Sequence, residues 1–270
     1  MMNSLRLKRR LQQGRLLVKP SAYDALSARI LERVGFEVIG LTGYGLSASL
    51  LGKPDVGLVT LTEAADAVRR ICRATDLPVI ADADTGFGNA INVMRTTEEY
   101  ILAGAAGFHI EDQVAPKRCG HVAGKQIISV EEAVGKVRAA DSVRKELDPH
   151  FLVIARTDAR GAVDGGLKET IERCKAYLDA GADMIFPDGL LDREELEICL
   201  EKIPGPLHFN MSGFHLPFEE LERLGVTIVS NPGGLLKSVI KSLWDYAQGF
   251  KSGGSAFMAK VDGELSSHPT

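Results

Sequence analysis

Short apolar runs alternate with longer segments of helical periodicity along most of the chain. Eight runs rich in Val, Ile, Leu and Ala have the character of strands buried on both faces. The predicted strands are Leu16–Pro20, Val38–Thr42, Pro78–Asp82, Gly107–Glu111, Leu152–Arg156, Met184–Pro187, Leu207–Asn210 and Thr227–Ser230. Each is followed by an amphipathic pattern that predicts a helix. These patterns cover Asp24–Val34, Thr62–Thr75, Ala90–Ala103, Val130–Glu146, Leu167–Ala180, Arg193–Ile203, Phe218–Leu224 and Leu235–Phe250.

Eight strand–helix units with short links favour a closed (β/α)8 TIM barrel over an open parallel sheet. Four of the predicted helices end at a glycine just before the next strand, where a helix end favours a left-handed residue: Gly35, Gly104, Gly181 and Gly225. The length of 270 residues is close to the roughly 250 typical of this fold. We therefore predict one catalytic barrel domain over residues 1–250 and a Gly- and Ser-rich tail over 251–270.

Composition narrows the class of protein. The net charge is −4, so no overall basic field attracts nucleic acid or anionic lipid. No apolar run approaches the ~18 residues of a membrane span, and no signal peptide opens the chain. Four cysteines without CxxC spacing do not make a disulfide framework, which favours a reducing compartment. We expect a cytoplasmic enzyme with no nucleic-acid or membrane partner.

Every predicted strand turns polar at its carboxyl end, where barrel active sites lie. The polar residues are Ser21, Tyr23, Asp24, Thr42, Tyr44, Asp82, Asp84, His109, Glu111, Asp112, Arg156, Thr157, Asp158, Asp188, His208, Asn210, Ser212 and Asn231. Packing alone does not require this pattern. A charge that enters a barrel mouth is costly unless it is paired or binds a metal, so we predict a shared polar pocket.

Four acids in this set suggest a metal site. Asp82 and Asp84 stand at alternate positions and point to one side of a strand end. Glu111 on the next strand, and Asp55 after the second strand, can converge on the same point. An oxygen-only ligand set suits Mg²⁺, or Mn²⁺ in its place, better than Zn²⁺. The alternative is that these acids cap helices or pair with Lys and Arg.

The loop after the fourth strand carries a candidate reactive thiol. Cys119 is flanked by Lys117 and Arg118 and followed by Gly120 and His121, a setting that favours the thiolate form. The other three cysteines lie inside helical patterns, where small packing roles are expected: Cys72, Cys174 and Cys199.

Arg156 is a candidate carboxylate ligand. A strand-end Arg can bind a carboxylate through two parallel hydrogen bonds, and an ion pair with Asp188 or Glu111 is compatible with that role. The backbone amides of Thr42, Gly43 and Tyr44 offer a second carboxylate site, because glycine permits close approach. Asn210 would add a neutral hydrogen bond.

Four motifs together resemble the isocitrate lyase/phosphoenolpyruvate mutase superfamily, in its branch of small lyases of the methylisocitrate and dimethylmalate type. They are Asp82–Asn89, His109–Gln113, Lys117–His121 and Ala155–Ala159. The resemblance covers most of the chain. It implies a barrel whose last helix is exchanged between subunits, giving homodimers or homotetramers.

The resemblance also implies roles for individual residues. Asp82 would bind Mg²⁺ directly, and three further acids would hold the waters of the metal: Asp55, Asp84 and Glu111. Cys119 would protonate the enolate left by carbon–carbon cleavage, while Arg156 and the Thr42–Tyr44 amides would hold the 2-oxo acid. The remaining pocket residues would be Lys117, Gly120, His121 and Asn210.

The sequence departs from the lyase pattern at three places. Thr42-Gly43-Tyr44 stands where Ser-Gly-Gly is usual, and Asp188 stands where Glu is usual. After the last strand, residues 231–237 lack the hydroxyl and Arg groups of lyases with tricarboxylic substrates. Fewer polar partners at that end favour a shorter acid of the malate type.

The predicted activity is therefore Mg²⁺-dependent cleavage of a 2-hydroxy di- or tricarboxylate into a 2-oxo acid and a carboxylate. Tyr44 and Asp188 are both candidates for the base that removes the hydroxyl proton. The alternatives are decarboxylation or hydrolysis of oxaloacetate, phosphonopyruvate or phosphoenolpyruvate mutase chemistry, and a metabolite-binding barrel without activity. The intact Lys117–His121 motif counts against the first two, and the retained acids count against the last.

Overall fold

The computed structural model of the chain describes residues 2–118 and 124–265. It separates into two compact units, residues 1–233 and residues 234–270. The first unit contains eight parallel strands. These are β1 (Leu17–Ala22), β2 (Ile39–Leu41), β3 (Val79–Asp82), β4 (Gly107–Glu111), β5 (Leu152–Thr157), β6 (Met184–Pro187), β7 (His208–Asn210) and β8 (Ile228–Asn231).

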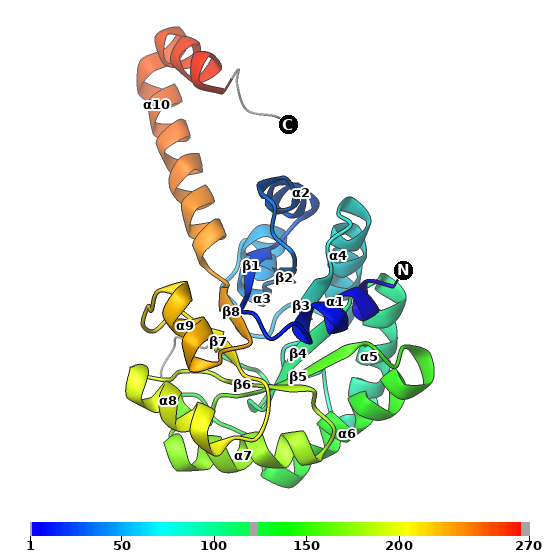
Figure 1. Ribbon diagram of the computed structural model, residues 1–270. Coiled ribbons are helices and arrows are strands. Elements are labelled where there is room, and N and C mark those ends of the chain that lie inside the picture. The colour runs from blue at the N-terminus through cyan, green and yellow to red at the C-terminus, as the bar shows by residue number, and fades with distance from the viewer. Residues whose placement is uncertain (1, 119–123, 266–270) are drawn as a thin grey trace. The chain divides into compact units, whose positions relative to one another are not determined.

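The strands close into a barrel. Their order is β6-β5-β4-β3-β2-β1-β8-β7, and a parallel bridge between Ile185 and Leu207 joins the two ends. Helices follow the strands and surround them (Figure 1). They are α2 (Ala25–Val34), α4 (Leu61–Ala74), α5 (Ala90–Ala103), α6 (Val130–Leu147), α7 (Leu167–Asp179), α8 (Arg193–Lys202) and α9 (Phe218–Leu224). Short turns of helix lie over Gly43–Leu46 (α3), Ser47–Leu51 and Ala159–Gly161. The predicted (β/α)8 fold is confirmed.

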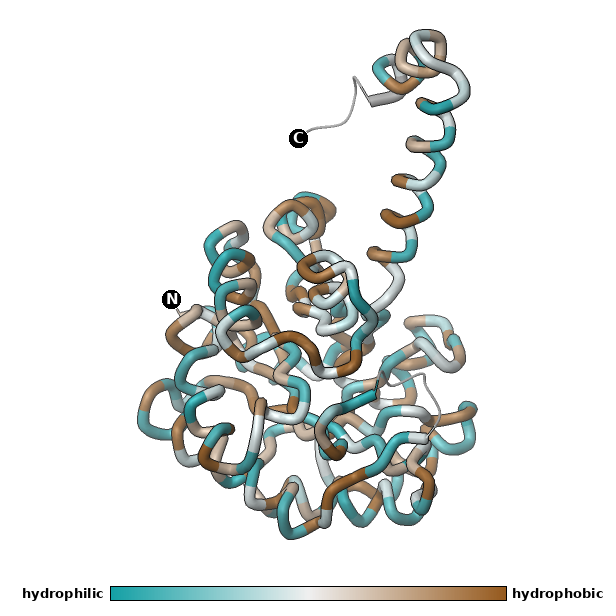
Figure 2. The backbone as a smooth tube through the Cα atoms, turned by 180° about the vertical axis from the view of Figure 1, so that it is seen from behind, coloured by the Kyte–Doolittle hydropathy of each residue, from teal (hydrophilic) through white to brown (hydrophobic). Residues whose placement is uncertain are grey.

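The predicted boundaries agree closely with the structure. No strand end differs from its prediction by more than two residues. The glycine caps are also present: Gly35 and Gly104 end α2 and α5 with φ values of 97° and 98°, a region that favours glycine. Along the helices, hydrophilic and hydrophobic residues alternate (Figure 2), as expected where one face is buried.

A first helix, α1 (Asn3–Leu11), was not predicted. Arg6 and Arg9 of this helix are exposed, and Lys8 is partly exposed. Leu7, however, is only 1% exposed. It packs in one hydrophobic cluster with Leu17, Leu152 and Ile228, which lie at the amino ends of their strands. Helix α1 therefore closes the end of the barrel opposite the predicted site.

The second unit is formed by the helix α10 (Gly234–Leu265), which bends at Gly254, where φ is 53°. The Phe257 ring folds back onto the preceding turns: a Cβ on Gly249 would lie 2.2 Å from it. The predicted helix over 235–250 is thus longer than expected, and it continues through residues 251–265 of the predicted tail.

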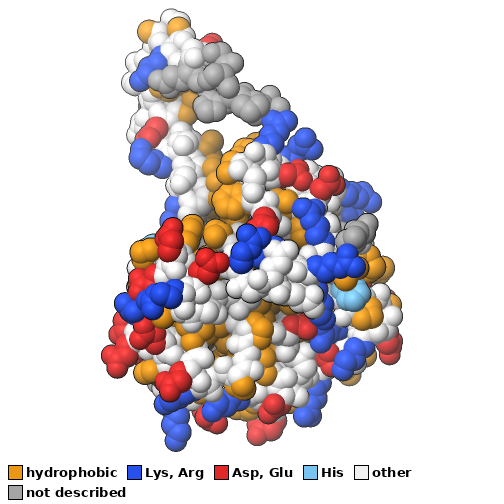
Figure 3. Space-filling model, viewed as in Figure 1, with side chains coloured by type: hydrophobic (Ala, Val, Ile, Leu, Met, Phe, Trp, Pro, Cys, Tyr) orange, Lys and Arg blue, Asp and Glu red, His pale blue; other side chains and the backbone are white. Residues whose placement is uncertain are grey.

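The surface gives two further facts about the kind of protein. Acidic and basic side chains are intermixed over much of the barrel surface shown in Figure 3. Among the helices that the structure describes, none has both the length and the apolar character needed to span a membrane.

Candidate active site

Asp82, at the carboxyl end of β3, is held in place by two backbone N–H groups. Its Oδ1 accepts a hydrogen bond from the backbone N–H of Asp84 at 3.0 Å, and its Oδ2 accepts one from the N–H of Gly43 at 3.0 Å. His109 Nε2 lies 3.3 Å from Oδ1. The backbone turns sharply here, because Asp84 has a φ of 46°, which is uncommon for a non-glycine residue. The turn brings Asp84 beside Asp82.

Lys117 joins Asp55 and Asp84. Its Nζ lies 2.7 Å from Asp55 Oδ1 and 2.7 Å from Asp84 Oδ1, and all three side chains are nearly inaccessible to solvent. Asp82 Oδ2 and Asp84 Oδ1 both lie close to the same point at Gly43, where a Cβ would meet them at 2.7 Å and 3.2 Å. Asp82 and Asp84 therefore lie together. The pairing of Asp55 and Asp84 with Lys117 is the alternative to a metal site that the sequence left open.

The donor set fits a hard divalent cation. Among residues 2–118 and 124–265, no three His, Cys, Asp or Glu side chains stand in the geometry of a metal site, and Asp55 and Asp84 are paired with Lys117. The available donors are carboxylate oxygens, and the one nearby imidazole nitrogen described, His109 Nε2, lies 3.3 Å from Asp82 Oδ1. Mg²⁺ typically takes one or two carboxylates and keeps several waters, which these residues can provide.

Burial and neighbouring charges move the pKa values of these acids in different directions. Burial raises the pKa of Asp84 to about 6, against Lys117, which lowers it. Burial also raises the pKa of Glu111 well above its usual range. For Asp82, burial is outweighed by His109, Lys117 and Arg156, which together hold its pKa well below the usual range. These charges therefore favour the carboxylate form of Asp82, the form that binds a metal.

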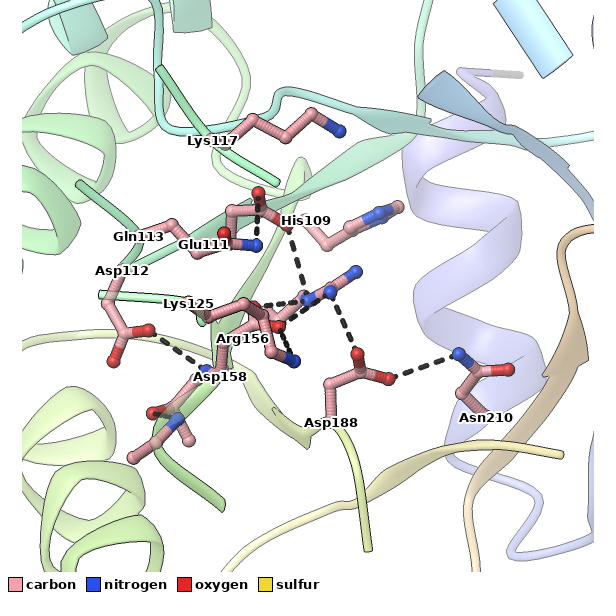
Figure 4. A network of polar contacts seen from close by, with 12 residues as sticks. His109, Glu111, Asp112, Gln113, Lys117, Lys125, Arg156, Asp158, Asp188 and Asn210 are labelled. Carbon is pink, nitrogen blue, oxygen red and sulfur yellow. Dashed lines mark hydrogen bonds and ion pairs between the residues drawn. The ribbon is translucent and has the colours of Figure 1, made fainter. Parts of the chain in front are cut away.

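Arg156, on β5, is the centre of the second half of the site (Figure 4). Its Nε and Nη2 donate to the two carboxylate oxygens of Asp158 at 2.8 Å and 2.9 Å, and Nη2 also donates to Asp188 at 2.8 Å. Nε lies 3.3 Å from Glu111 Oε2. The predicted ion pairs with Asp188 and Glu111 are both present.

Asp188 and Asn210 continue this network across to β7. Asn210 Nδ2 donates to Asp188 Oδ1 at 3.1 Å, while Asn210 Oδ1 accepts from the hydroxyl of Ser212 at 2.7 Å. Both oxygens of Asp188 thus accept hydrogen bonds from neighbours. Asn210 fixes Asp188 in place at the edge of the polar network (Figure 4).

Two residues behind the site hold its parts in position. Asp112 accepts hydrogen bonds from the Tyr177 hydroxyl at 2.7 Å and from the Asp158 N–H at 2.9 Å, which ties β4 and β5 to α7. Gln113 donates to Glu111 at 3.0 Å and to the carbonyl of Arg118 at 2.9 Å. Gln113 thereby connects the acid cluster to the residue that precedes Cys119.

Most of the predicted site residues are brought together at the carboxyl ends of the strands. The acid cluster contains Asp55, Asp82, Asp84, Glu111 and Lys117, and the arginine network contains Arg156, Asp188 and Asn210. Cys119, Gly120 and His121 lie outside the described residues, so their predicted roles stay predictions. In the predicted carboxylate cradle Thr42-Gly43-Tyr44, the Gly43 N–H is directed to Asp82. Asp24 is a helix cap, accepting from Ser27 N–H at 2.7 Å.

Sequence reasoning missed one buried cation, Lys19 on β1. It is 3% exposed, and burial lowers its pKa to about 8, against Asp82, which raises it. Its Nζ occupies the space beside Gly40, where a Cβ would approach it to 2.9 Å. The signal was available: Lys19 and Ser21 are alternate residues of one apolar strand and therefore share a face.

Comparison with known proteins agrees with this geometry. The family model described as phosphoenolpyruvate phosphomutase matches residues 7–251. A 2,3-dimethylmalate lyase from Eubacterium barkeri is 45% identical over 249 residues, which cover 91% of this chain and 85% of that protein.

Two solved structures show the same similarity. An oxaloacetate acetylhydrolase in complex with 3,3-difluorooxalacetate has a TM-score of 0.89 and 35% identity, covering 93% of this chain and 87% of that one. A phosphonopyruvate hydrolase in complex with oxalate and Mg²⁺ has a TM-score of 0.88 and 30% identity, covering 100% and 92% of the two chains.

Proposed function

The chain belongs to the phosphoenolpyruvate mutase family, and we propose that it is a Mg²⁺-dependent carbon–carbon lyase. Its substrate would be a 2-hydroxy dicarboxylate of the malate type, cleaved to a 2-oxo acid and a carboxylate. The 45% identity to a 2,3-dimethylmalate lyase over 91% of the chain supports this class of reaction.

The observation that carries the proposal is the pairing of two unlike polar groups at one end of the barrel. The cluster of Asp55, Asp82, Asp84 and Glu111 suits a divalent cation, and Arg156 suits a carboxylate. Glu111 connects the two groups: it lies 3.3 Å from the Arg156 guanidinium, and the charges of Lys117 and Asp82 both act on its pKa. A 2-hydroxy acid presents a carboxylate next to a hydroxyl oxygen, so it can contact both groups at once.

Asp82 would hold Mg²⁺ directly, with Asp55, Asp84 and Glu111 around it. When bound there, the ion would stabilise negative charge on the oxygen that becomes the 2-oxo group. Lys117 balances the charge of Asp55 and Asp84 in this structure. The similar phosphonopyruvate hydrolase, whose structure contains Mg²⁺, supports the choice of metal.

Arg156 would bind the substrate carboxylate next to the reacting carbon. Tyr44 or Asp188 would take the hydroxyl proton, after which the bond between C2 and C3 breaks. C2 becomes the carbonyl of the 2-oxo acid, and the electron pair stays on C3 as a carboxylate-stabilised enolate. Cys119 would then donate its proton to C3, completing the carboxylate product.

The test is release of 2-oxo acid from a panel of malates: malate, 2-methylmalate, 3-methylmalate and 2,3-dimethylmalate. We expect turnover of at least one member with Mg²⁺, loss of turnover with EDTA, and return of activity when Mg²⁺ is restored. Turnover that is equal with and without metal, or no cleavage of any malate in the panel, would contradict the proposal.

Hydrolysis of oxaloacetate to oxalate and acetate is the second candidate, because an oxaloacetate acetylhydrolase has a TM-score of 0.89 to this chain. Adding oxaloacetate to the panel separates the two activities. Acetate and oxalate as the main products, with no malate cleaved, would favour the hydrolase.

We further propose a homo-oligomer, a dimer or tetramer, located in the cytoplasm. Exposed apolar side chains on α10 support the first point: Ile240, Leu243, Trp244 and Phe250. Free cysteines at three described positions agree with a reducing compartment. Light scattering during size-exclusion chromatography would test the oligomer, and a monomer would contradict it.

A further inference from the structure

Two buried cations share the carboxylate of Asp158. Lys125 Nζ lies 2.7 Å from Oδ1, to which Arg156 Nη2 also donates, while Arg156 Nε donates to Oδ2. The side chains of Asp158 and Lys125 are 0% and 3% exposed. Both cations lower the pKa of Asp158, against burial, which raises it. Asp158 is therefore a fixed anion between two fixed cations.

This contact determines how the Arg156 guanidinium is turned. A guanidinium is planar, so two parallel hydrogen bonds to one carboxylate fix its plane and its rotation. Arg156 Nε and Nη2 donate hydrogen bonds to Asp158, and Nη2 also donates one to Asp188. Nη1 takes part in none of the hydrogen bonds that Arg156 makes with the described residues. In Figure 4, one Arg156 nitrogen has no dashed line to the residues drawn. The Nη1 edge is the one left to bind a ligand.

Lys125 is itself held by the backbone. Its carbonyl accepts a hydrogen bond from Val163 N–H at 3.1 Å, and residues 125 and 162 form a parallel bridge. A Cβ on Gly161 would lie 3.3 Å from Lys125 Nζ, so the ammonium group is closely enclosed. The cation is therefore presented to Asp158 from a defined position.

Lys125 also contributes to the balance of charge around Arg156. Three carboxylates contact the single guanidinium of Arg156: Glu111, Asp158 and Asp188. Lys125 is the second cation on Asp158, and it reduces the share of that carboxylate's charge that Arg156 must neutralise. Without Lys125, the single guanidinium would face all three carboxylates alone. Because uncompensated buried charge is costly, the Arg156 side chain would be expected to shift.

We propose that Lys125 is a positioning residue for the reaction, which acts through Asp158 to hold the Nη1 edge of Arg156 toward the substrate carboxylate. The inference rests on the proposed role of Arg156 as carboxylate ligand.

A double-mutant cycle tests the link. Oxalate affinity is measured by calorimetry at saturating Mg²⁺ for the wild type, Lys125→Met, Arg156→Gln and the double variant. We expect Lys125→Met to weaken oxalate binding by roughly 10- to 100-fold, since a small misplacement of a binding group has effects of that size. In the Arg156→Gln background, Lys125→Met should weaken oxalate binding by less than about threefold.

The outcomes separate this inference from the proposed function. Two results would overturn the role of Lys125 and leave that of Arg156 intact. One is unchanged oxalate affinity in folded Lys125→Met. The other is a double variant whose loss of oxalate affinity is the product of the two single losses. Wild-type affinity in Arg156→Gln would overturn the carboxylate role of Arg156 and this inference with it. If Lys125→Met does not fold, Lys125→Gln replaces it in the same cycle, with the same expectation.

A matched control distinguishes positioning from general stability. Arg144 pairs with Asp141 at 2.7 Å and is also largely buried, but it contacts the Gly181 carbonyl near the amino end of β6. We expect Arg144→Met to lower the melting temperature and leave oxalate affinity unchanged. Loss of oxalate affinity in proportion to melting temperature in both variants would show that Lys125 is merely structural.

Discussion

Lys19→Met should stabilise the protein by an amount that depends on pH in a defined way. Lys19 is 3% exposed, and burial lowers its pKa from 10.5 to about 8. The folded protein therefore releases this proton at lower pH than the unfolded chain does. Between pH 8 and pH 10.5 the unfolded chain binds more protons, so the contribution of Lys19 to stability rises with pH across that window.

The size of the effect follows from the two pKa values of Lys19, 10.5 and about 8. The cost of holding the charged Lys19 is about 3 kcal/mol at pH 7, about 2 kcal/mol at pH 9 and below about 1 kcal/mol at pH 10. Methionine has a similar length and no charge. The free energy of unfolding of Lys19→Met should therefore exceed that of the wild type by an amount that falls by about 2.5 kcal/mol from pH 7 to pH 10.

Urea unfolding followed by circular dichroism at pH 7, 9 and 10, at one protein concentration, measures this difference. Other groups that titrate in the same range cancel, because they are common to both proteins. Lys202→Met, at an exposed position near the end of α8, is the control, and its difference from the wild type should not change with pH. If the difference in the free energy of unfolding between Lys19→Met and the wild type is constant or rises with pH, the assignment of Lys19 as a buried charge is refuted.

Three further changes test other parts of the molecule. Asp82→Asn should weaken Mg²⁺ binding by at least about tenfold in calorimetry, with Asp24→Asn as a control that keeps wild-type affinity; equal affinity in both variants would contradict the metal assignment. Cys119→Ser should abolish cleavage while pyruvate and Mg²⁺ still bind, and retained turnover would exclude the acid role. Leu7→Ala should lower the free energy of unfolding by about 2–5 kcal/mol with little change in kcat, and a loss below about 1 kcal/mol would show that α1 does not close the barrel.

The order of strands and helices could be predicted from the sequence because each unit carries its own periodicity and its own end signal. The glycines at 35 and 104 mark helix ends in the sequence, and their backbone confirms it. Helix α1 was missed because only two of its residues, Ser4 and Leu7, are buried. Two buried positions are too few to give a recognisable helical pattern in a segment rich in Lys and Arg.

The candidate site was predictable in its members but not in its pairings. The acids and Arg156 follow from strand ends, since all strands of a barrel present the same end to one pocket. Which cation meets which carboxylate depends on side chains distant in sequence, as Lys117 with Asp55 and Lys125 with Asp158 show. Lys19 was overlooked because a single charged residue does not change the apolar pattern of its strand. The space that it occupies beside Gly40 is seen only in the structure.

The position of Lys117 has a consequence for how the protein comes into being in a cell. Asp55 and Asp84 already have a counterion supplied by their own chain, so the newly made barrel need not wait for a metal to offset their mutual repulsion. We expect the chain to fold when magnesium is scarce, because these two acids are already paired within the barrel. Folding of this part of the barrel would then depend on the charges of the chain itself and not on the supply of a metal.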